Sequence, residues 1–240
     1  MGNSILFLAA NTTRSKYYSQ AMIENNIFPD MAILMGIQDK EKIFARHYSL
    51  KKSTYKNVRL FNDAISLVDT CKKLTQNLFI LSEKTSNTDT VRDLIKKSKA
   101  SLIIYSGFPG EIVKSSLLDL NIPFLHMHPG LLPQYRGSTT VYYSILKEKS
   151  CGVSAIILNK GIDTGRIIKQ KTYPAPPESI DIDTVYDPAI RTDLLIDVLK
   201  EYKRLGEEAL LGNTQDSTVG QTYYIIHPLL KHLAIKKCCK

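Results

Sequence analysis

The sequence predicts a doubly wound, Rossmann-like α/β fold, with helices on both faces of a mostly parallel sheet and a short C-terminal extension. Three observations predict it. Short, continuous apolar runs recur through the first half of the chain, and helix-length amphipathic stretches separate them. Strands that are buried on both faces have this continuous apolar pattern. The length of 240 residues suits one sizeable domain that forms its own core.

The elements of the first half follow from this alternation. Strands are expected at residues 4–10, 31–35, 78–81, 102–105 and 123–127. Helices are expected between them, at residues 15–26, 58–74 and 90–99. Ligands of such sheets bind outside the carboxyl ends of the strands. The residues just after positions 10, 105 and 127 are therefore the places to search for a site.

The pattern changes after residue 138. A helix at 140–147 precedes two strands, 153–158 and 166–171, and a proline-rich link follows at 174–177. Beyond it we expect a helix at 184–205, a strand at 222–226 and a solvated basic tail that holds Lys231, Lys236, Lys237 and Lys240. The apolar stretch 223–228 is expected to pack against the main sheet or against a dimer partner. Residues 1–175 are thus predicted to form the main domain and residues 176–240 an extension.

Composition and charge narrow the class of protein. Lys and Arg total 32 against 23 Asp and Glu, a formal net charge of +9, and 43% of the residues are hydrophobic. That composition is globular, and the charge indicates an anionic partner. The longest early apolar run is too short for a signal peptide or a membrane span. Four cysteines without a Cys-x-x-Cys spacing predict a cytoplasmic protein with neither a disulfide framework nor a zinc site.

Two histidines stand out because they leave the same face of one strand end. His126 and His128 lie two residues apart, and the Pro-Gly that follows them ends the strand. Such a pair is often structural. Metal binding is weakly supported, because no third His or Cys is near and Asp163 would have to serve, so we expect no metal here.

A second polar segment, Lys160 to Gly165, joins two expected strands. On its own, its Asp163-Thr-Gly is more often a simple turn in which Asp bonds its own backbone. A functional role for this segment is suggested only when it is considered together with the histidine segment.

Together these segments resemble the formyltransferase family, which uses N10-formyltetrahydrofolate. The family's signature is Asn-x-His, then Leu-Leu-Pro-x-x-Arg-Gly, and later Gly-x-Asp-x-Gly. The corresponding residues of this chain are His126-Met-His128, Leu131-Leu-Pro-Gln-Tyr-Arg-Gly137 and Gly161-Ile-Asp-Thr-Gly165. The resemblance implies that His128 and Asp163 are catalytic and that Asp163 also contacts the folate. His126 replaces the family's asparagine, so either it donates a hydrogen bond in one tautomer or the chain is an impaired relative; we favour an active enzyme.

Upstream, residues 105–113 occupy the place of the family segment that holds the pteridine ring of the folate. The resemblance implies cofactor contacts from Gly107, Phe108, Pro109, Gly110 and Ile112. Glycines permit close backbone approach, and Phe108 and Ile112 can wall a flat ring. Without the resemblance, an ordinary strand-to-helix turn would be the preferred interpretation.

The first loop after the N-terminal strand combines capping and basic residues. Free N–H groups at a helix start favour an anion. The resemblance implies substrate contacts from this loop and from the Arg-Gly stretch, namely from Asn11, Thr12, Thr13, Arg14, Lys16 and Arg136. A purely structural role is nearly as good an interpretation for any one of them. No Gly-x-Gly-x-x-Gly or Walker pattern occurs, which argues against a dinucleotide or ATP cofactor.

The basic segment 40–59 carries seven Lys and Arg residues and one Glu. Its two tyrosines are compatible with nucleotide or single-strand binding. A solvated surface loop is the preferred interpretation, so nucleic acid is not an expected partner.

Three formyl acceptors follow from the resemblance. Methionyl-tRNA enzymes carry an additional C-terminal barrel, for which residues 178–240 are too few and too poor in strands. Glycinamide ribonucleotide enzymes carry a glycine-rich phosphate loop, and residues 11–14 contain no glycine. We therefore favour N-formylation of an amino-deoxysugar on a nucleotide diphosphate, for bacterial surface glycans. A catalytically impaired nucleotide- or nucleic-acid-binding relative is the alternative from a different class.

Overall fold

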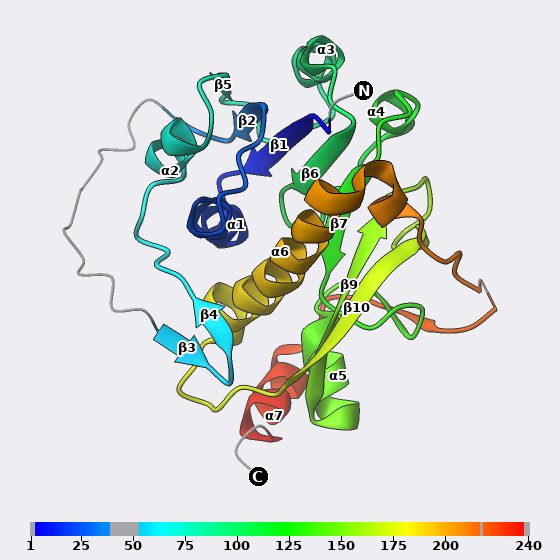
Figure 1. Cartoon of the computed structure of the whole chain (residues 1–240). Coiled ribbons are helices and arrows are strands. Elements are labelled where there is room, and N and C mark those ends of the chain that lie inside the picture. The colour runs from blue at the N-terminus through cyan, green and yellow to red at the C-terminus, as the bar shows by residue number, and fades with distance from the viewer. Residues whose placement is uncertain (1–2, 39–52, 217, 238–240) are drawn as a thin grey trace.

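The computed structural model describes residues 3–38, 53–216 and 218–237 of the chain (Figure 1). Most of the basic segment 40–59, and Lys240 of the expected tail, lie outside these residues. No helix in the described part of the chain is long and apolar enough to cross a membrane.

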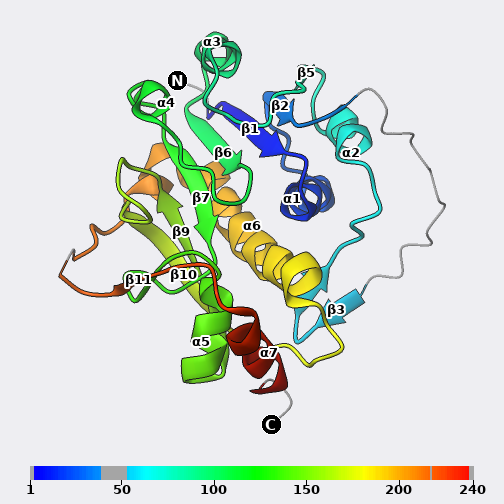
Figure 2. The same ribbon diagram turned by 180° about the vertical axis from the view of Figure 1, so that it is seen from behind.

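A seven-stranded sheet forms the centre of the molecule, in the order β10-β9-β7-β6-β1-β2-β5 (Figures 1 and 2). Five strands from β7 to β5 run parallel, whereas β9 pairs antiparallel with β7 and with β10. The strands are β1 (Ile5–Ala10), β2 (Met31–Met35), β5 (Leu78–Ile80), β6 (Leu102–Ser106), β7 (Phe124–His128), β9 (Ser150–Ile157) and β10 (Ile167–Pro174). The predicted doubly wound, mostly parallel fold is confirmed.

Helices pack on both faces of this sheet, as Figure 2 shows from behind. One face is covered by α1 (Thr13–Glu24), α2 (Leu67–Leu74), α5 (Thr140–Glu148) and α6 (Asp187–Leu205). The other face is covered by α3 (Asp89–Ser98) and α4 (Ser115–Leu118). Alternate residues of β1 divide between the two cores: Phe7 belongs to the first and Leu8 to the second. This division explains why the strand is apolar at every position.

The predicted helix 58–74 is wrong in its first half. Val58–Leu60 is a strand, β4, which pairs antiparallel with β3 (Ser53–Tyr55). Helix α2 begins only at Leu67, where the Ser66 side chain accepts a hydrogen bond from the Asp69 amide. That N-cap satisfies one of the free amides at the helix start and fixes the boundary there.

The C-terminal extension differs from the expectation in two ways. Strand β11 (Gln221–Tyr223) pairs with β8 (Tyr135–Gly137) of the same chain, in a separate two-stranded parallel sheet, and not with the main sheet. The expected solvated tail is helix α7 (Pro228–Lys237), which lies beside α5. Lys231 pairs with Asp183, Lys236 with Glu178, and Lys237 donates to the Leu146 carbonyl.

Helix α6 also belongs to the main core, although the sequence places it in the extension. A single π-helical turn, Ile182–Tyr186, precedes it. Its apolar residues share the core cluster of β1, β7 and β9, and it packs against α1. The boundary at residue 175 therefore stays a prediction, because much of the predicted extension packs into the core of the predicted main domain.

Candidate active site

A cavity of about 730 Å³ opens at the carboxyl ends of β1, β6 and β7, where a doubly wound sheet is expected to bind its ligands. Its lining brings together segments that are far apart in the sequence. They fall within residues 12–14, 105–113, 126–129, 137–142, 158–163, 183–191 and 222–225.

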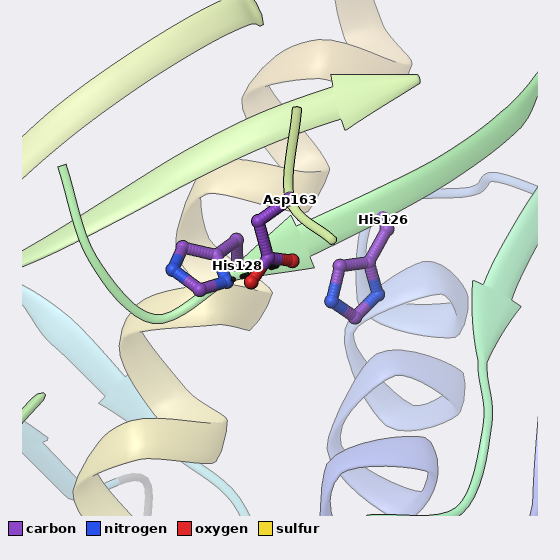
Figure 3. A group of neighbouring side chains, drawn as sticks. All are labelled: His126, His128 and Asp163. Carbon is purple, nitrogen blue, oxygen red and sulfur yellow. Dashed lines mark ion pairs between the residues drawn. The ribbon is translucent and has the colours of Figure 1, made fainter. Parts of the chain in front are cut away.

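His128 is the last residue of β7, and its imidazole is only 2% exposed. Its Nε2 lies 2.6 Å from the Tyr135 carbonyl oxygen. Its Nδ1 lies 3.3 Å from Asp163 Oδ1 (Figure 3). Both ring nitrogens therefore face oxygen acceptors, and the orientation of the ring is fixed.

Asp163 lies on the turn between β9 and β10, in a left-handed backbone conformation with φ of +53°. The Gly137 amide donates to its Oδ2 at 2.8 Å. Burial alone would raise the pKa of this carboxyl. The hydrogen bond and charge of His128, together with the Gly137 amide, outweigh burial and lower the pKa to about 2. Asp163 is therefore a carboxylate at neutral pH.

The two contacts of His128 constrain its protons. A neutral imidazole carries one N–H, so either tautomer leaves one ring nitrogen facing an oxygen with no proton between them. The doubly protonated ring satisfies both contacts at once. A proton on Nδ1 would lie between the two side chains.

His126 lies on the other side of the Asp163 carboxylate, which Figure 3 shows between the two rings. Its Nδ1 is buried and has no hydrogen-bond partner among the described residues. Burial, and then the positive charges of Arg14 and Arg191, lower the pKa of this imidazole to about 3. His126 is therefore neutral at physiological pH, with an unsatisfied buried nitrogen at the cavity wall.

Arg14 joins the first loop to the end of β6. Its Nε donates to Ser106 Oγ at 3.1 Å and its Nη2 to the Gly107 carbonyl at 2.5 Å. Burial and then the nearby Arg191 lower the pKa of the guanidinium. Arg14 thus both lines the cavity and fixes the start of the segment that was predicted to hold a cofactor.

That predicted cofactor segment lies at the cavity. Gly107, Phe108, Pro109, Gly110 and Ile112 all line it. Glu111 holds this segment in place, because its Oε2 accepts hydrogen bonds from Tyr105 Oη and from the Phe108 amide. A Cβ on Gly107 would lie 2.0 Å from Tyr105 Oη, so a larger residue there would displace the Tyr105 side chain. The cofactor contacts themselves stay a prediction.

The predicted substrate residues divide into two groups. Thr12 and Thr13 line the cavity with Arg14, whereas Asn11, Lys16 and Arg136 are not among the lining residues. Lys16 donates to the Asp63 carbonyl, and the Arg136 guanidinium donates to Gln215 Oε1 and the Asp216 carbonyl. The described contacts of Lys16 and Arg136 thus attach α1 and β8 to loop residues that are not part of the lining.

Sequence reasoning missed the cavity wall that the second half of the chain supplies. Asp187 and Arg191 form an ion pair at 2.9 Å on the first turns of α6. Asp183 accepts from Tyr142 Oη. The Asp-x-x-x-Arg spacing at the start of a helix was a detectable signal for this pair, but the segment was assigned to an extension.

The charge of the lining differs from that of the chain. The described residues of the lining include two guanidiniums, four carboxylates and no lysine. They are Arg14, Arg191, Glu111, Asp163, Asp183 and Asp187. The positive net charge of the whole sequence is therefore carried outside this part of the cavity wall.

Comparison with known proteins identifies the fold family. The family described as formyl transferase matches residues 3–191. A methionyl-tRNA formyltransferase from Finegoldia magna is 26% identical over 144 residues, which cover 58% of this chain and 46% of that protein. The chain thus spans about half the length of that curated relative.

Solved structures share the fold. A sugar N-formyltransferase from a Shewanella species superposes with a TM-score of 0.57 at 16% identity, over 99% of this chain and 88% of that chain. HypX from Aquifex aeolicus, solved in complex with tetrahydrofolic acid, gives a TM-score of 0.55 at 16% identity, over 95% of this chain and 30% of that chain. Because the family match spans well over half of the sequence, the chain belongs to the formyl transferase family.

Proposed function

We propose that this chain transfers a formyl group from N10-formyltetrahydrofolate to a primary amine. The observation that carries the proposal is the buried His128–Asp163 pair, whose Nδ1 and Oδ1 atoms lie 3.3 Å apart at the wall of a large cavity. Formyl transfer needs such a pair, because the amine loses a proton and the departing folate nitrogen gains one. A positioned acid–base group contributes roughly 10²–10⁴-fold to such a reaction.

The described residues fit a folate. The Phe108 ring and the apolar side chains of Ile112 and Val113 line one side of the cavity, beside the backbone of Gly107 and Gly110. Pockets for ring-shaped ligands are lined mainly by apolar side chains with a few polar groups. The His126 ring adds a polar group to the same lining. The tetrahydrofolate complex of HypX supports the same ligand class.

The bound folate supplies the formyl group. In the transfer, a bond forms between the amine nitrogen and the formyl carbon, and the bond from that carbon to folate N10 breaks. One proton leaves the amine and one reaches N10, so charge and atoms balance. Asp163, an ionised carboxylate, can accept the first proton, and the His128 ring that faces it can supply the second, directly or through water.

His126 can replace the amide donor of the family's asparagine. The neutral ring carries one N–H. That N–H can donate to the formyl oxygen as negative charge develops there. One such donor in a water-excluded site lowers the barrier by about 3 kcal/mol.

For the acceptor, we favour the aminoacyl end of methionyl-tRNA over the amino sugar that the sequence analysis favoured. The name of the curated relative supports it. So does the charge distribution: a net charge of +9 suits a polyanion, yet carboxylates outnumber guanidiniums in the lining. The polyanion would then lie outside the cavity, and its amino group would enter it.

A nucleotide-linked amino sugar is the second candidate. The match of a sugar N-formyltransferase over 99% of this chain favours it. Its diphosphate would need free cations, and one of the two guanidiniums in the described lining, that of Arg191, is already paired with Asp187. The cavity charge therefore ranks this acceptor second.

A direct assay separates these alternatives. The chain is incubated with N10-formyltetrahydrofolate and one acceptor at a time: methionyl-tRNA, a panel of amino-sugar nucleotides, and glycinamide ribonucleotide. Release of tetrahydrofolate and mass of the acceptor are followed. We expect formyl-methionyl-tRNA, and its loss in His128→Ala. Turnover of an amino-sugar nucleotide alone would support the second candidate. No turnover with any acceptor would refute formyl transfer.

A further inference from the structure

The two histidines and the aspartate form a cluster that catalysis alone does not require. One ring nitrogen of each of His126 and His128 and one oxygen of Asp163 lie within 4.8 Å of one another. The resemblance puts an asparagine at the position of His126, so this chain adds an imidazole to the His–Asp pair. Two imidazoles and one carboxylate with open positions are a donor set for divalent transition ions.

We propose that His126, His128 and Asp163 bind a divalent transition-metal ion of the Zn²⁺ class, which occupies the atoms of the His128–Asp163 pair and blocks formyl transfer. The ion would not be a resident cofactor. Metal binding does not depend on the identity of the acceptor, whereas the inhibition rests on the proposed function.

The outer contacts of the cluster support metal binding. His128 Nε2 faces the Tyr135 carbonyl at 2.6 Å. Donation of its N–H to that carbonyl leaves Nδ1 with a free lone pair that faces Asp163. Ligating histidines characteristically donate their second N–H to a backbone carbonyl or a carboxylate. Asp163 is held in the same way, because the Gly137 amide donates to its Oδ2.

A cation also resolves an electrostatic conflict. With the proton of His128 on Nε2, its Nδ1 and Asp163 Oδ1 face each other at 3.3 Å as two acceptors. Either a proton or a metal ion must lie there to make the contact attractive. A bound ion would therefore occupy the two atoms that the proposed reaction uses.

The geometry sets the strength of the site. Zn²⁺ ligands lie at about 2.0–2.2 Å, so two ligand atoms on one ion are at most about 4.4 Å apart. The three ligand atoms, which lie within 4.8 Å of one another, must therefore move slightly closer together to bind one ion. His126 also lacks an outer partner on Nδ1 among the described residues. An exchangeable, inhibitory ion fits these features better than a permanently bound one.

The test measures binding of Zn²⁺ and Co²⁺ to the metal-free full chain by calorimetry and by the visible absorption of Co²⁺. Cys238→Ser and Cys239→Ser are combined in all samples, because adjacent thiols bind the same ions. His126→Asn removes one ligand at similar size. His232→Asn removes an exposed histidine of α7 and is the matched control.

We expect one ion per chain, at least about 10-fold weaker binding in His126→Asn, and no change in His232→Asn. Far-UV circular dichroism checks that each variant is folded, and Asp163→Asn provides a second variant that must also weaken binding. No stoichiometric binding, or equal weakening by His126→Asn and His232→Asn, would overturn the proposal.

The second readout is formyl transfer with and without Zn²⁺. We expect inhibition of the unsubstituted site that chelator reverses, and a higher Zn²⁺ concentration for half-inhibition of His126→Asn, each relative to its own metal-free rate. Binding without inhibition would refute the proposed block of formyl transfer. If the metal-free chain transfers no formyl group at all, the proposed function fails, while the binding measurement still decides the metal site.

Discussion

Replacement of Asp163 by asparagine tests the proposed chemistry most directly. Asn keeps the size of the side chain and can still accept from the Gly137 amide, but it removes the negative charge that faces His128 Nδ1 at 3.3 Å. Without that charge, a proton on His128 Nδ1 is no longer stabilised by a carboxylate. The substitution therefore changes the proton arrangement and leaves the cavity wall in place.

The magnitude follows from the environment of the carboxylate. The pKa of Asp163 falls from 3.8 to about 2, which corresponds to about 2 kcal/mol of favourable interaction with the charged form. Loss of an acid–base partner costs roughly 10²–10⁴-fold in rate. We expect kcat of Asp163→Asn to fall by at least about 100-fold, while KM for the folate changes less than about threefold, because the lost interaction acts in the transition state.

Stability gives an independent readout of the same pair. Because the folded-state pKa of Asp163 is lowered, its contribution is present above its unfolded value near pH 4 and is lost as the pH falls through about 2. Urea unfolding should show wild type to be more stable than Asp163→Asn by about 2 kcal/mol at neutral pH. The difference should disappear between pH 4 and pH 2.

A surface carboxylate provides the control. Asp119 pairs with Lys160 in the exposed ion pair near the same turn, and Asp119→Asn should leave kcat unchanged. If Asp163→Asn kept more than about a tenth of the wild-type kcat, the pair would not supply the acid–base contribution assigned to it. The reasoning about the His128–Asp163 pair would then be refuted.

Three further substitutions have specific expected outcomes. Gly107→Ala drives a Cβ to within 2.0 Å of Tyr105 Oη, so KM for the folate should rise by about 10-fold or more, and isothermal titration with tetrahydrofolate should show the same loss. Gly137→Ala introduces a Cβ at φ of +95° and 2.1 Å from the Tyr223 carbonyl, so it should lower the melting temperature and kcat together; a change in neither would refute the tight β8–β11 contact. Burial raises the pKa of the Cys71 thiol to about 12, so its protonated form contributes stability that is lost as the pH rises above about 9. Urea unfolding between pH 8 and pH 11 should therefore show a steeper decline for wild type than for Cys71→Ala, and equal slopes would contradict it.

The main sheet could be predicted because its strands are apolar at every position. The small β3–β4 hairpin could not. Tyr55 of β3 donates to the Ala175 carbonyl and packs edge-on against Tyr186, contacts with residues more than 100 positions away. No local pattern around residue 58 carries that information, so the alternation there was assigned to a helix.

The candidate site likewise contains residues that could be predicted from the sequence and residues that could not. The placement of His128 and Asp163 together follows from two short motifs, and the structure brings their side chains to 3.3 Å. Arg191 was not predicted, because its meaning depends on the packing of α6 beside β7, where it reaches the Met127 carbonyl. Arg136 shows the converse: its motif suggested a substrate contact, and its guanidinium donates to Gln215 and the Asp216 carbonyl.

The pairing of β11 with β8 has a consequence for synthesis on the ribosome. The five parallel strands are complete once β7 has emerged, so the core can begin to fold early. The cavity wall formed by Thr222–Ile225 arrives almost 100 residues later, and Tyr223 then covers Gly137, whose amide holds Asp163. A nascent chain that stalls before Gln221 would carry both His128 and Asp163 and lack this wall, so the proposed activity should appear only after the β8–β11 sheet has formed.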